Sequence, residues 1–377
     1  MEWNPIWSQV RVSSPILHLT GKKKRTVIFT VAVPQNGEKL RIRFSGEQSK
    51  YPVVIGSLRI WLNGKSTPVT VQGASSFTIP ARESLVSDEI PVSVKVGDQL
   101  EVRIYYLSKP AESNAIEEKA ISFSGDQTAM AVLPEYKEPD YKAKYGIYDF
   151  ISSISKIEVY SESPVYRIIA FGDSITAMSR WTKPLQKRLQ DSYGGKYVLL
   201  NAGISGNCLL YEKKGMMGAL YGQKGVDRFQ RDVMQEENLH CVILALGVND
   251  ISYLNAKTKK NINQKSYQEA VKDLVAQLRN QNVRVVGHTM TPRKGYTFGK
   301  KYTQEAEGLR QEINAWLRSC NLFDLLVDTD AILRDPNAAD VILEGLHQGD
   351  HLHPNEAGGQ KIADGYDLQK LTGENDG

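Results

Sequence analysis

The pattern of apolar residues changes near residue 160, and this change constrains the fold more than any other feature of the sequence. Between Arg25 and Leu107, apolar residues alternate with polar or small ones, which is typical of strands with one buried face. Beyond Pro164, apolar residues form continuous runs separated by helical patterns. Because the two patterns need different architectures, and 377 residues exceed the usual size of one core, we predict two domains, residues 1–160 and 161–377.

The first domain is predicted to be an antiparallel, jelly-roll-like β-sandwich, since it combines many short strands with turn signals. Asn36-Gly37 and Asn63-Gly64 stand between alternating runs and predict tight turns, because a type I′ turn needs positive φ at both central residues. The expected strands cover Val27 to Val33, Leu40 to Phe44, Leu58 to Leu62, Ile90 to Val94, Leu100 to Tyr106 and, last, Ser155 to Tyr160.

The second domain is predicted to be an α/β fold with a parallel sheet covered on both faces. Helical patterns run from Tyr267 to Leu278 and from Ala306 to Leu317, where apolar residues recur three and four positions apart. Strand and helix in alternation imply right-handed crossovers between parallel strands. The expected buried strands are Arg167 to Phe171, Tyr197 to Leu200, Val242 to Leu246, Val283 to Val286 and Phe323 to Val327.

Polar, glycine-bearing loops follow the strands of this second domain. The carboxyl ends of parallel strands share one edge of a sheet, and ligands bind at that edge in open α/β folds. We therefore expect these loops to meet and to form a site. They are Gly172 to Ser174, Asn201 to Asn207, Gly247 to Asp250 and Gly349 to Pro354.

These loops contain the groups that a reactive serine needs. The hydroxyl of Ser174 requires a base to take its proton, and the base requires a partner that stabilises its charged form. Asp350 and His353 are three residues apart, so one turn at a helix start would place the carboxylate beside the imidazole. Donors for a developing alkoxide are available from the N–H groups of Ser174 and Gly206 and from the side-chain amide of Asn249.

Gly172-Asp-Ser-Ile-Thr176, the Gly206 loop, Gly247-Val-Asn249 and Asp350-His-Leu-His353 together resemble the four blocks of the SGNH, or GDSL-type, esterase superfamily. The resemblance covers roughly residues 164 to 370. It implies a flavodoxin-like three-layer α/β/α fold with no cofactor. More loosely, it extends to bacterial members that carry an N-terminal β-sandwich, which suggests an accessory or carbohydrate-binding role for residues 1–160.

The same resemblance implies the role of each group. Ser174 is the expected nucleophile, His353 the base and Asp350 its partner, while the N–H groups of Ser174 and Gly206 and the Asn249 amide form the oxyanion hole. The chain departs from the superfamily after Thr176, where Ala177-Met178 replaces the frequent acidic residue and glycine. Substrate contacts in that loop are therefore less well defined by the resemblance.

Other residues near the expected site have both a functional and a structural interpretation. Ser174 alone would more often be a helix N-cap, and Asp173 is typical of a carboxylate near a helix N-terminus. Asn249 would otherwise be a turn residue, and Asp250 is expected to hydrogen-bond a loop. His288 is equally compatible with the core. The candidates for the substrate pocket are Asp173, Trp181, Asn207, Tyr211, His288 and Arg293.

Two other site classes are disfavoured. His347, His351 and His353 lie near Asp350 and invite a metal site, but no helical His-x-x-x-His pair and no thiolate ligand is expected there, so we expect no metal. His351 is expected at the surface. The α/β-hydrolase fold requires Gly-x-Ser-x-Gly, whereas Thr176 stands at the last glycine position.

The resemblance implies a carboxylic ester hydrolase, and we expect it to act on small acyl groups, acetyl above all, on carbohydrate, partly from the resemblance and partly because the edge loops are polar and lack an apolar lid. Aryl, lipid or thioester substrates are the alternative, and a glycan-binding protein with a vestigial site is a third. The net charge of +4 gives no reason to expect nucleic acid as a partner, nor is a membrane partner expected; a homo-oligomer is left open. The start at Met1 shows no leader pattern, and Cys208, Cys241 and Cys320 fit reduced thiols, so a cytoplasmic location is expected.

Overall fold

The computed structural model divides the chain into two compact units. It describes residues 1–377 except 16–17, 19–20, 111, 115–119, 137–150, 163–164, 216–217, 253–262, 297–301 and 375–377. The first unit comprises Met1–Val165, Gly194–Val198 and Lys214–Gly222, and the second comprises Tyr166–Tyr193, Leu199–Lys213 and Gln223–Gly377. Pro164, where the second apolar pattern begins, lies outside the described residues.

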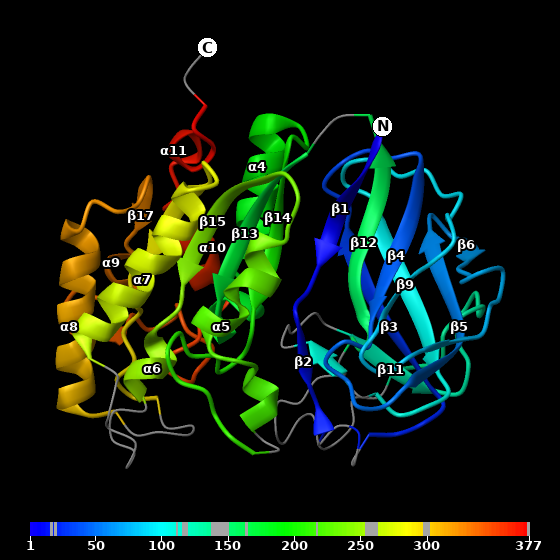
Figure 1. Cartoon of the computed structure of the whole chain (residues 1–377), viewed down its shortest axis with the longest axis horizontal. Coiled ribbons are helices and arrows are strands. Elements are labelled where there is room, and N and C mark those ends of the chain that lie inside the picture. The colour runs from blue at the N-terminus through cyan, green and yellow to red at the C-terminus, as the bar shows by residue number, and fades with distance from the viewer. Residues whose placement is uncertain are drawn as a thin grey trace. The chain divides into compact units, whose positions relative to one another are not determined.

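Antiparallel sheets build the first unit, as Figure 1 shows in blue and cyan. Strands β4 (Lys39–Ser45) and β9 (Gln99–Tyr106) belong to different sheets, yet their apolar residues share one buried cluster. This is the arrangement of a β-sandwich. One sheet has the strand order β1 (Glu2–Ser8), β12 (Ile154–Ser161), β4 and β8 (Ser84–Val86). The other has the order β11 (Ile121–Ser124), β3 (Arg25–Ala32), β9, β5 (Val53–Leu62) and β6 (Lys65–Pro68), and β7 (Phe77–Ile79) also pairs with β5. Strands β2 (Arg11–Ser13) and β10 (Glu112–Asn114) form a separate two-stranded sheet.

One of the two predicted Asn-Gly turns is present and the other is wrong. Asn63 and Gly64 have φ of 50° and 76° and join β5 to β6, as a type I′ turn requires. Asn36-Gly37 makes no such turn, because β3 and β4 belong to different sheets and the chain crosses between them. Gly37 instead pairs with Val94 in an isolated bridge.

Strand β1 was not expected from the sequence, and the predicted strand from Ile90 to Val94 is reduced to isolated bridges. In β1, the three consecutive residues Asn4 to Ile6 are all buried, so buried and exposed side chains do not alternate as they do in a strand with one buried face. The strand is stabilised by antiparallel pairing with β12, more than 140 residues away, which no local pattern reveals.

A parallel sheet forms the centre of the second unit, with the order β14 (Tyr197–Gly203), β13 (Tyr166–Gly172), β15 (Leu239–Ala245), β16 (Arg284–His288) and β17 (Leu325–Val327). The first strand along the chain, β13, therefore has β14 on one side and β15 on the other. The strand order reverses at this position, and the crevice beside such a reversal is where open α/β sheets bind ligands. All five predicted strands are present, but β17 is shorter than predicted, lies at the edge of the sheet, and has only Val327 buried.

Helices cover this sheet in two layers, which are visible in Figure 1. Helices α5 (Gly225–Phe229), α7 (Gln264–Arg279) and α8 (Gln304–Ser319) contact one another in that order, and α4 (Thr182–Tyr193) contacts α10 (Glu356–Asp364). Right-handed crossovers place the two groups on opposite faces. The second unit is therefore a three-layer α/β/α domain, as the sequence predicted. Shorter elements are α3 (Ser174–Ala177), η1 (Gly218–Tyr221), η2 (Gln230–Met234), α6 (Val248–Ser252), α9 (Thr329–Leu333), β18 (Arg334–Asp335), β19 (Ala338–Ile342) and α11 (Leu368–Thr372).

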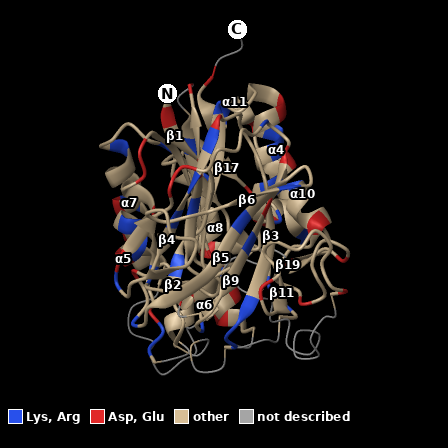
Figure 2. Cartoon of the chain, turned by 90° about the vertical axis from the view of Figure 1, so that its right-hand side faces the viewer, with Lys and Arg blue, Asp and Glu red and all other residues tan. Residues whose placement is uncertain are grey.

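Charged residues of both signs occur on the elements of each unit, as Figure 2 shows. Mixed charge of this kind is usual for a protein surface. Among the helices that the structure describes, none is long and apolar enough to cross a membrane.

Candidate active site

Ser174 begins the short helix α3 directly after β13. The N-cap of this helix is Asp173, whose carboxylate accepts a hydrogen bond of 3.0 Å from the N–H of Ile175. The capping interpretation therefore applies to Asp173 and not to Ser174. Because Asp173 satisfies the helix start, the Ser174 hydroxyl is available for another partner.

That partner is His353. Its Nε2 atom lies 2.8 Å from Ser174 Oγ, and its Nδ1 atom lies 2.5 Å from Asp350 Oδ2. Partial burial opposes ionisation of Asp350, but the hydrogen bond and charge of His353, with the backbone N–H groups of Leu352 and His353, outweigh it and lower the pKa of that carboxyl. Asp350 is therefore ionised at neutral pH and can stabilise a protonated imidazole.

The segment that carries Asp350 and His353 differs from the predicted helical turn. It is a bend held by Asp350 Oδ1, which accepts the N–H groups of Leu352 at 3.1 Å and His353 at 2.9 Å. Helix α10 starts only at Glu356, with Asn355 as its N-cap. The side chain of Asp350 thus replaces helical hydrogen bonds and brings itself beside the imidazole.

His351 is not the surface residue that the sequence predicted. It has φ of +61° and is half-buried, and its ring centroid lies 4.4 Å from that of His347. His347 Nδ1 accepts the N–H of Gly349 at 3.0 Å and that of His351 at 3.3 Å. The two histidines therefore help to shape the bend around Asp350.

The Gly206 loop and Asn249 are held together. Gly206 has φ of +72°, a conformation that favours glycine. Asn249, in α6, donates from Nδ2 to the carbonyl oxygen of Asn207 at 3.0 Å. Asp250 accepts the N–H groups of Leu209 and Leu210, both at 2.7 Å, so its predicted role in a loop is observed. Burial raises the pKa of Asp250 to about 6, although these backbone donors oppose the shift.

Three of the residues predicted to line a substrate pocket are packed inside the domain instead. Trp181 is 1% exposed, with its ring centroid 4.9 Å from that of His288. Asn207 is buried and donates to Gln223 O at 2.7 Å. Arg293 is also buried and donates to Ser252 Oγ at 2.6 Å. Tyr211 is half-buried.

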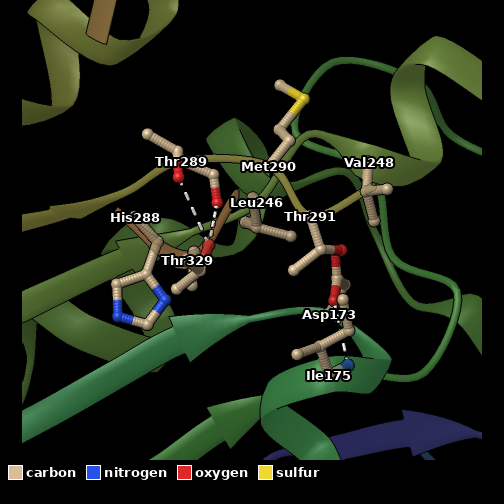
Figure 3. A pocket seen from close by; sticks show the side chains of 10 residues that line it. Asp173, Ile175, Leu246, Val248, His288, Thr289, Met290, Thr291 and Thr329 are labelled. Carbon is tan, nitrogen blue, oxygen red and sulfur yellow. Dashed lines mark hydrogen bonds between the residues drawn. The ribbon is translucent and has the colours of Figure 1, made fainter. Parts of the chain in front are cut away.

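Asp173 and His288 line a small cavity behind the start of α3. Figure 3 shows Asp173 and Ile175 on one side of it and Thr289 and Met290 on another. The cavity measures about 30 Å³, which exceeds the ~10–15 Å³ that one water molecule needs. Burial raises the pKa of Asp173 to about 7, and it lowers the pKa of His288 to about 3, so the His288 ring is neutral at pH 7. His288 Nε2 is hydrogen-bonded to the Tyr366 hydroxyl.

Within the described ranges, no three His, Cys, Asp or Glu side chains are grouped as ligands of a metal ion would be. The His353 imidazole, which the sequence offered as a ligand, contacts Ser174 and Asp350 instead.

An α/β/α domain in which Ser174, His353 and Asp350 are hydrogen-bonded at the carboxyl edge of a parallel sheet has the arrangement of a serine hydrolase. A family model confirms the class at residues 170–361. The chain belongs to the GDSL-like lipase/acylhydrolase family, and it is a carboxylic ester hydrolase. No curated protein matches the sequence.

Solved structures similar to this chain include three esterases or lipases. An aryl esterase from M. smegmatis is 16% identical, with a TM-score of 0.42, over 55% of this chain and 100% of that one. An acetylxylan esterase from Geobacillus stearothermophilus is 18% identical, with a TM-score of 0.40, over 55% and 94%. A GDSL-like lipase from Bacteroides thetaiotaomicron is 15% identical, with a TM-score of 0.39, over 54% and 88%.

Proposed function

We propose that the chain is a serine esterase that removes small acyl groups, acetyl above all, from carbohydrate esters through an acyl-enzyme. The observation that carries this proposal is the path of hydrogen bonds from Asp350 through His353 to Ser174, with distances of 2.5 and 2.8 Å. A serine hydroxyl becomes a good nucleophile when a base takes its proton and a third group holds that base.

In the proposed reaction, Ser174 Oγ attacks the ester carbonyl carbon while its proton passes to His353 Nε2. Asp350 stabilises the resulting imidazolium through Nδ1. When the tetrahedral intermediate collapses, the bond to the alcohol breaks, and the departing oxygen takes the proton from His353. A water molecule then attacks the acyl-enzyme with His353 as base, which releases the carboxylic acid and restores Ser174.

The proposed oxyanion hole consists of the N–H groups of Ser174 and Gly206 and the Nδ2 group of Asn249. A side-chain amide carries two N–H donors, and one of those of Asn249 bonds to Asn207 O at 3.0 Å. That bond orients the amide, so the second donor is held ready for the negative oxygen of the intermediate. Groups fixed before the reaction stabilise such charge without reorganisation.

The preference for a small acyl group rests on the polar character of the four edge loops. A series of nitrophenyl esters from C2 to C12 tests it, and activity that is highest at C8 or longer would instead favour lipid substrates. Acetate release from acetylated oligosaccharides, measured beside Ser174→Ala, tests the carbohydrate part. Hydrolysis of aryl acetates without any release from the oligosaccharides would favour the arylesterase alternative.

All of the proposed catalytic residues lie in the second unit. We therefore propose that residues 161–377 form the catalytic domain and residues 1–160 an accessory, carbohydrate-binding-like domain. Ser174→Ala protein should bind acetylated oligosaccharide with unchanged affinity if binding and catalysis are separate in this way. If wild type also fails to react with a fluorophosphonate, the chain is better described as a glycan-binding protein.

A further inference from the structure

Arg228 is a buried arginine that the sequence did not single out. It lies in α5 with 0% exposure, and its guanidinium carbon lies 4.0 Å from the ring centroid of Phe171 in β13. Asp232 supplies a counter-charge, with Oδ2 3.1 Å from Arg228 Nη1. Burial lowers the pKa of Arg228 to about 10 despite this partner, so the charged group is held in the interior at a cost.

The guanidinium donates to the ends of two neighbouring strands. Nη2 bonds to the carbonyl oxygen of Gly172 at 3.0 Å, and Nη1 bonds to that of Ala202, also at 3.0 Å. Gly172 directly precedes Asp173 and Ser174, while Ala202 leads into the loop of Gly206. Arg228 thus fixes the spacing between the proposed nucleophile and one of the proposed oxyanion donors.

A third bond extends this network to Asn249. Arg228 Nε donates to Asn207 Oδ1 at 2.9 Å, and the carbonyl oxygen of the same Asn207 accepts the bond from Asn249 Nδ2 at 3.0 Å. A planar guanidinium can hold three acceptors in fixed directions, whereas a lysine ammonium cannot reproduce that fork. The buried arginine is therefore matched to its three carbonyl acceptors by shape as well as by charge.

We propose that Arg228 is a positioning residue for ester hydrolysis, which holds the Ser174 turn, the Gly206 loop and, through Asn207, the amide of Asn249 in the arrangement that the transition state needs. Buried ion pairs often contribute little net stability, so a role in catalysis explains this one better than stability alone. The inference rests on the proposed function, because it acts through groups assigned there.

The test is a double-mutant cycle with Arg228→Lys and Asn249→Ala on the full chain, with nitrophenyl acetate as substrate. Arg228→Lys should lower kcat about 10- to 100-fold with KM within about 3-fold, since the oxyanion donors act only in the transition state. The loss on adding Asn249→Ala should be smaller in the Arg228→Lys background than in the wild type, because the two residues act in one path.

Arg167→Lys is the matched control. Arg167 is also buried and paired, with Nη1 2.8 Å from Glu236 Oε1, but it lies near the opposite end of β13. The Arg167→Lys variant should therefore have the kcat of the wild type. Asn207→Ala, which removes one of the three acceptors, gives a second and milder variant should Arg228→Lys unfold.

Independent, multiplying effects of Arg228→Lys and Asn249→Ala would overturn the inference, as would a wild-type kcat in Arg228→Lys. If Arg228→Lys unfolds, a wild-type kcat in Asn207→Ala would overturn it as well. An Asn249→Ala enzyme with wild-type kcat would overturn the oxyanion hole of the proposed function, and this inference with it.

Discussion

The Nε2 atom of His353 lies 2.8 Å from the Oγ atom of Ser174, although 179 positions separate the two residues in the chain. Ser174 begins α3, directly after β13, whereas His353 belongs to the bend before α10. The distance is that of a hydrogen bond through which a proton can pass, so the chemistry depends on how firmly each loop is held.

We expect Asp350→Asn to lower kcat by about 100-fold or more. The amide can no longer accept the Nδ1 proton as an anion, so His353 loses the partner that stabilises its charged form, and the imidazole can adopt the wrong tautomer. Steady-state hydrolysis of nitrophenyl acetate measures the change. Asn retains an acceptor for the N–H groups of Leu352 and His353, so the bend should persist, but the stability that the ionised carboxylate contributes at neutral pH is lost, and thermal unfolding is measured beside the kinetics. A kcat within a factor of two of wild type would contradict this role.

Asn249→Ala should lower kcat about 100- to 1,000-fold with little change in KM, because it removes a donor that acts on the developing oxyanion. The variant also removes the bond to Asn207 O. A calorimetric scan is therefore needed beside the kinetics. An increase in KM with unchanged kcat would mean that Asn249 binds the ground state instead.

Asp173 should make stability depend on pH. Its pKa is raised from 3.8 to about 7 by burial, so the folded chain holds this proton more tightly than the unfolded chain. The free energy of unfolding should fall by at most roughly 4 kcal/mol as pH rises from about 4 to 7, and it should level off at higher pH. Asp250, whose pKa is raised to about 6, acts in the same direction.

Asp173→Asn tests this dependence, because the amide keeps an acceptor for the N–H of Ile175 but cannot ionise. Calorimetry between pH 4.5 and 8 should give a shallower slope for the variant and a higher midpoint at pH 8. Asp273→Asn, on the exposed side of α7, is the matched change of charge and should follow the wild type. Parallel slopes for wild type and Asp173→Asn would show that the carboxyl is ionised in the folded state.

Arg310→Ala should destabilise the second unit by about 3 to 5 kcal/mol, since it leaves the buried carboxylate of Glu307 without its arginine, while Asp330 keeps its ion pair with Arg318. Arg310 is 1% exposed and lies 2.6 Å from both Asp330 and Glu307. Arg279 is 42% exposed and pairs with Asp324 at the surface. Arg279→Ala should therefore lower the free energy of unfolding by at most about 1 kcal/mol. Urea denaturation compares the two, and equal losses would contradict the importance of burial.

The sequence was sufficient to predict the parallel sheet and the loops that meet at its edge. Strands such as β13 and β15 are buried on both faces, so they are visible as continuous apolar runs. The residues that directly follow such runs must lie at one edge of the sheet, and this rule places Ser174 and Asn249 near one another. His353 follows β17 only after α9, β18 and β19, so its expected position depended also on the resemblance to the superfamily.

The residues that support the site were harder to predict. Arg228 looks like an ordinary helical arginine, and only the packing of α5 against the ends of β13 and β14 shows that its donors reach Gly172 and Ala202. Likewise, the burial of Trp181 depends on contacts with His288 and Tyr366, which are over 100 residues away. Long-range contacts of this kind leave no local pattern in the sequence.

Covalent labelling tests most directly whether Ser174 carries the acyl group. Wild-type protein incubated with a fluorophosphonate should gain the mass of one adduct, located on the peptide that contains Ser174. Ser174→Ala should gain none, and its rate of nitrophenyl acetate hydrolysis should fall at least about 1,000-fold. An unlabelled wild type, an adduct on another residue, or a Ser174→Ala enzyme as active as the wild type would contradict the account.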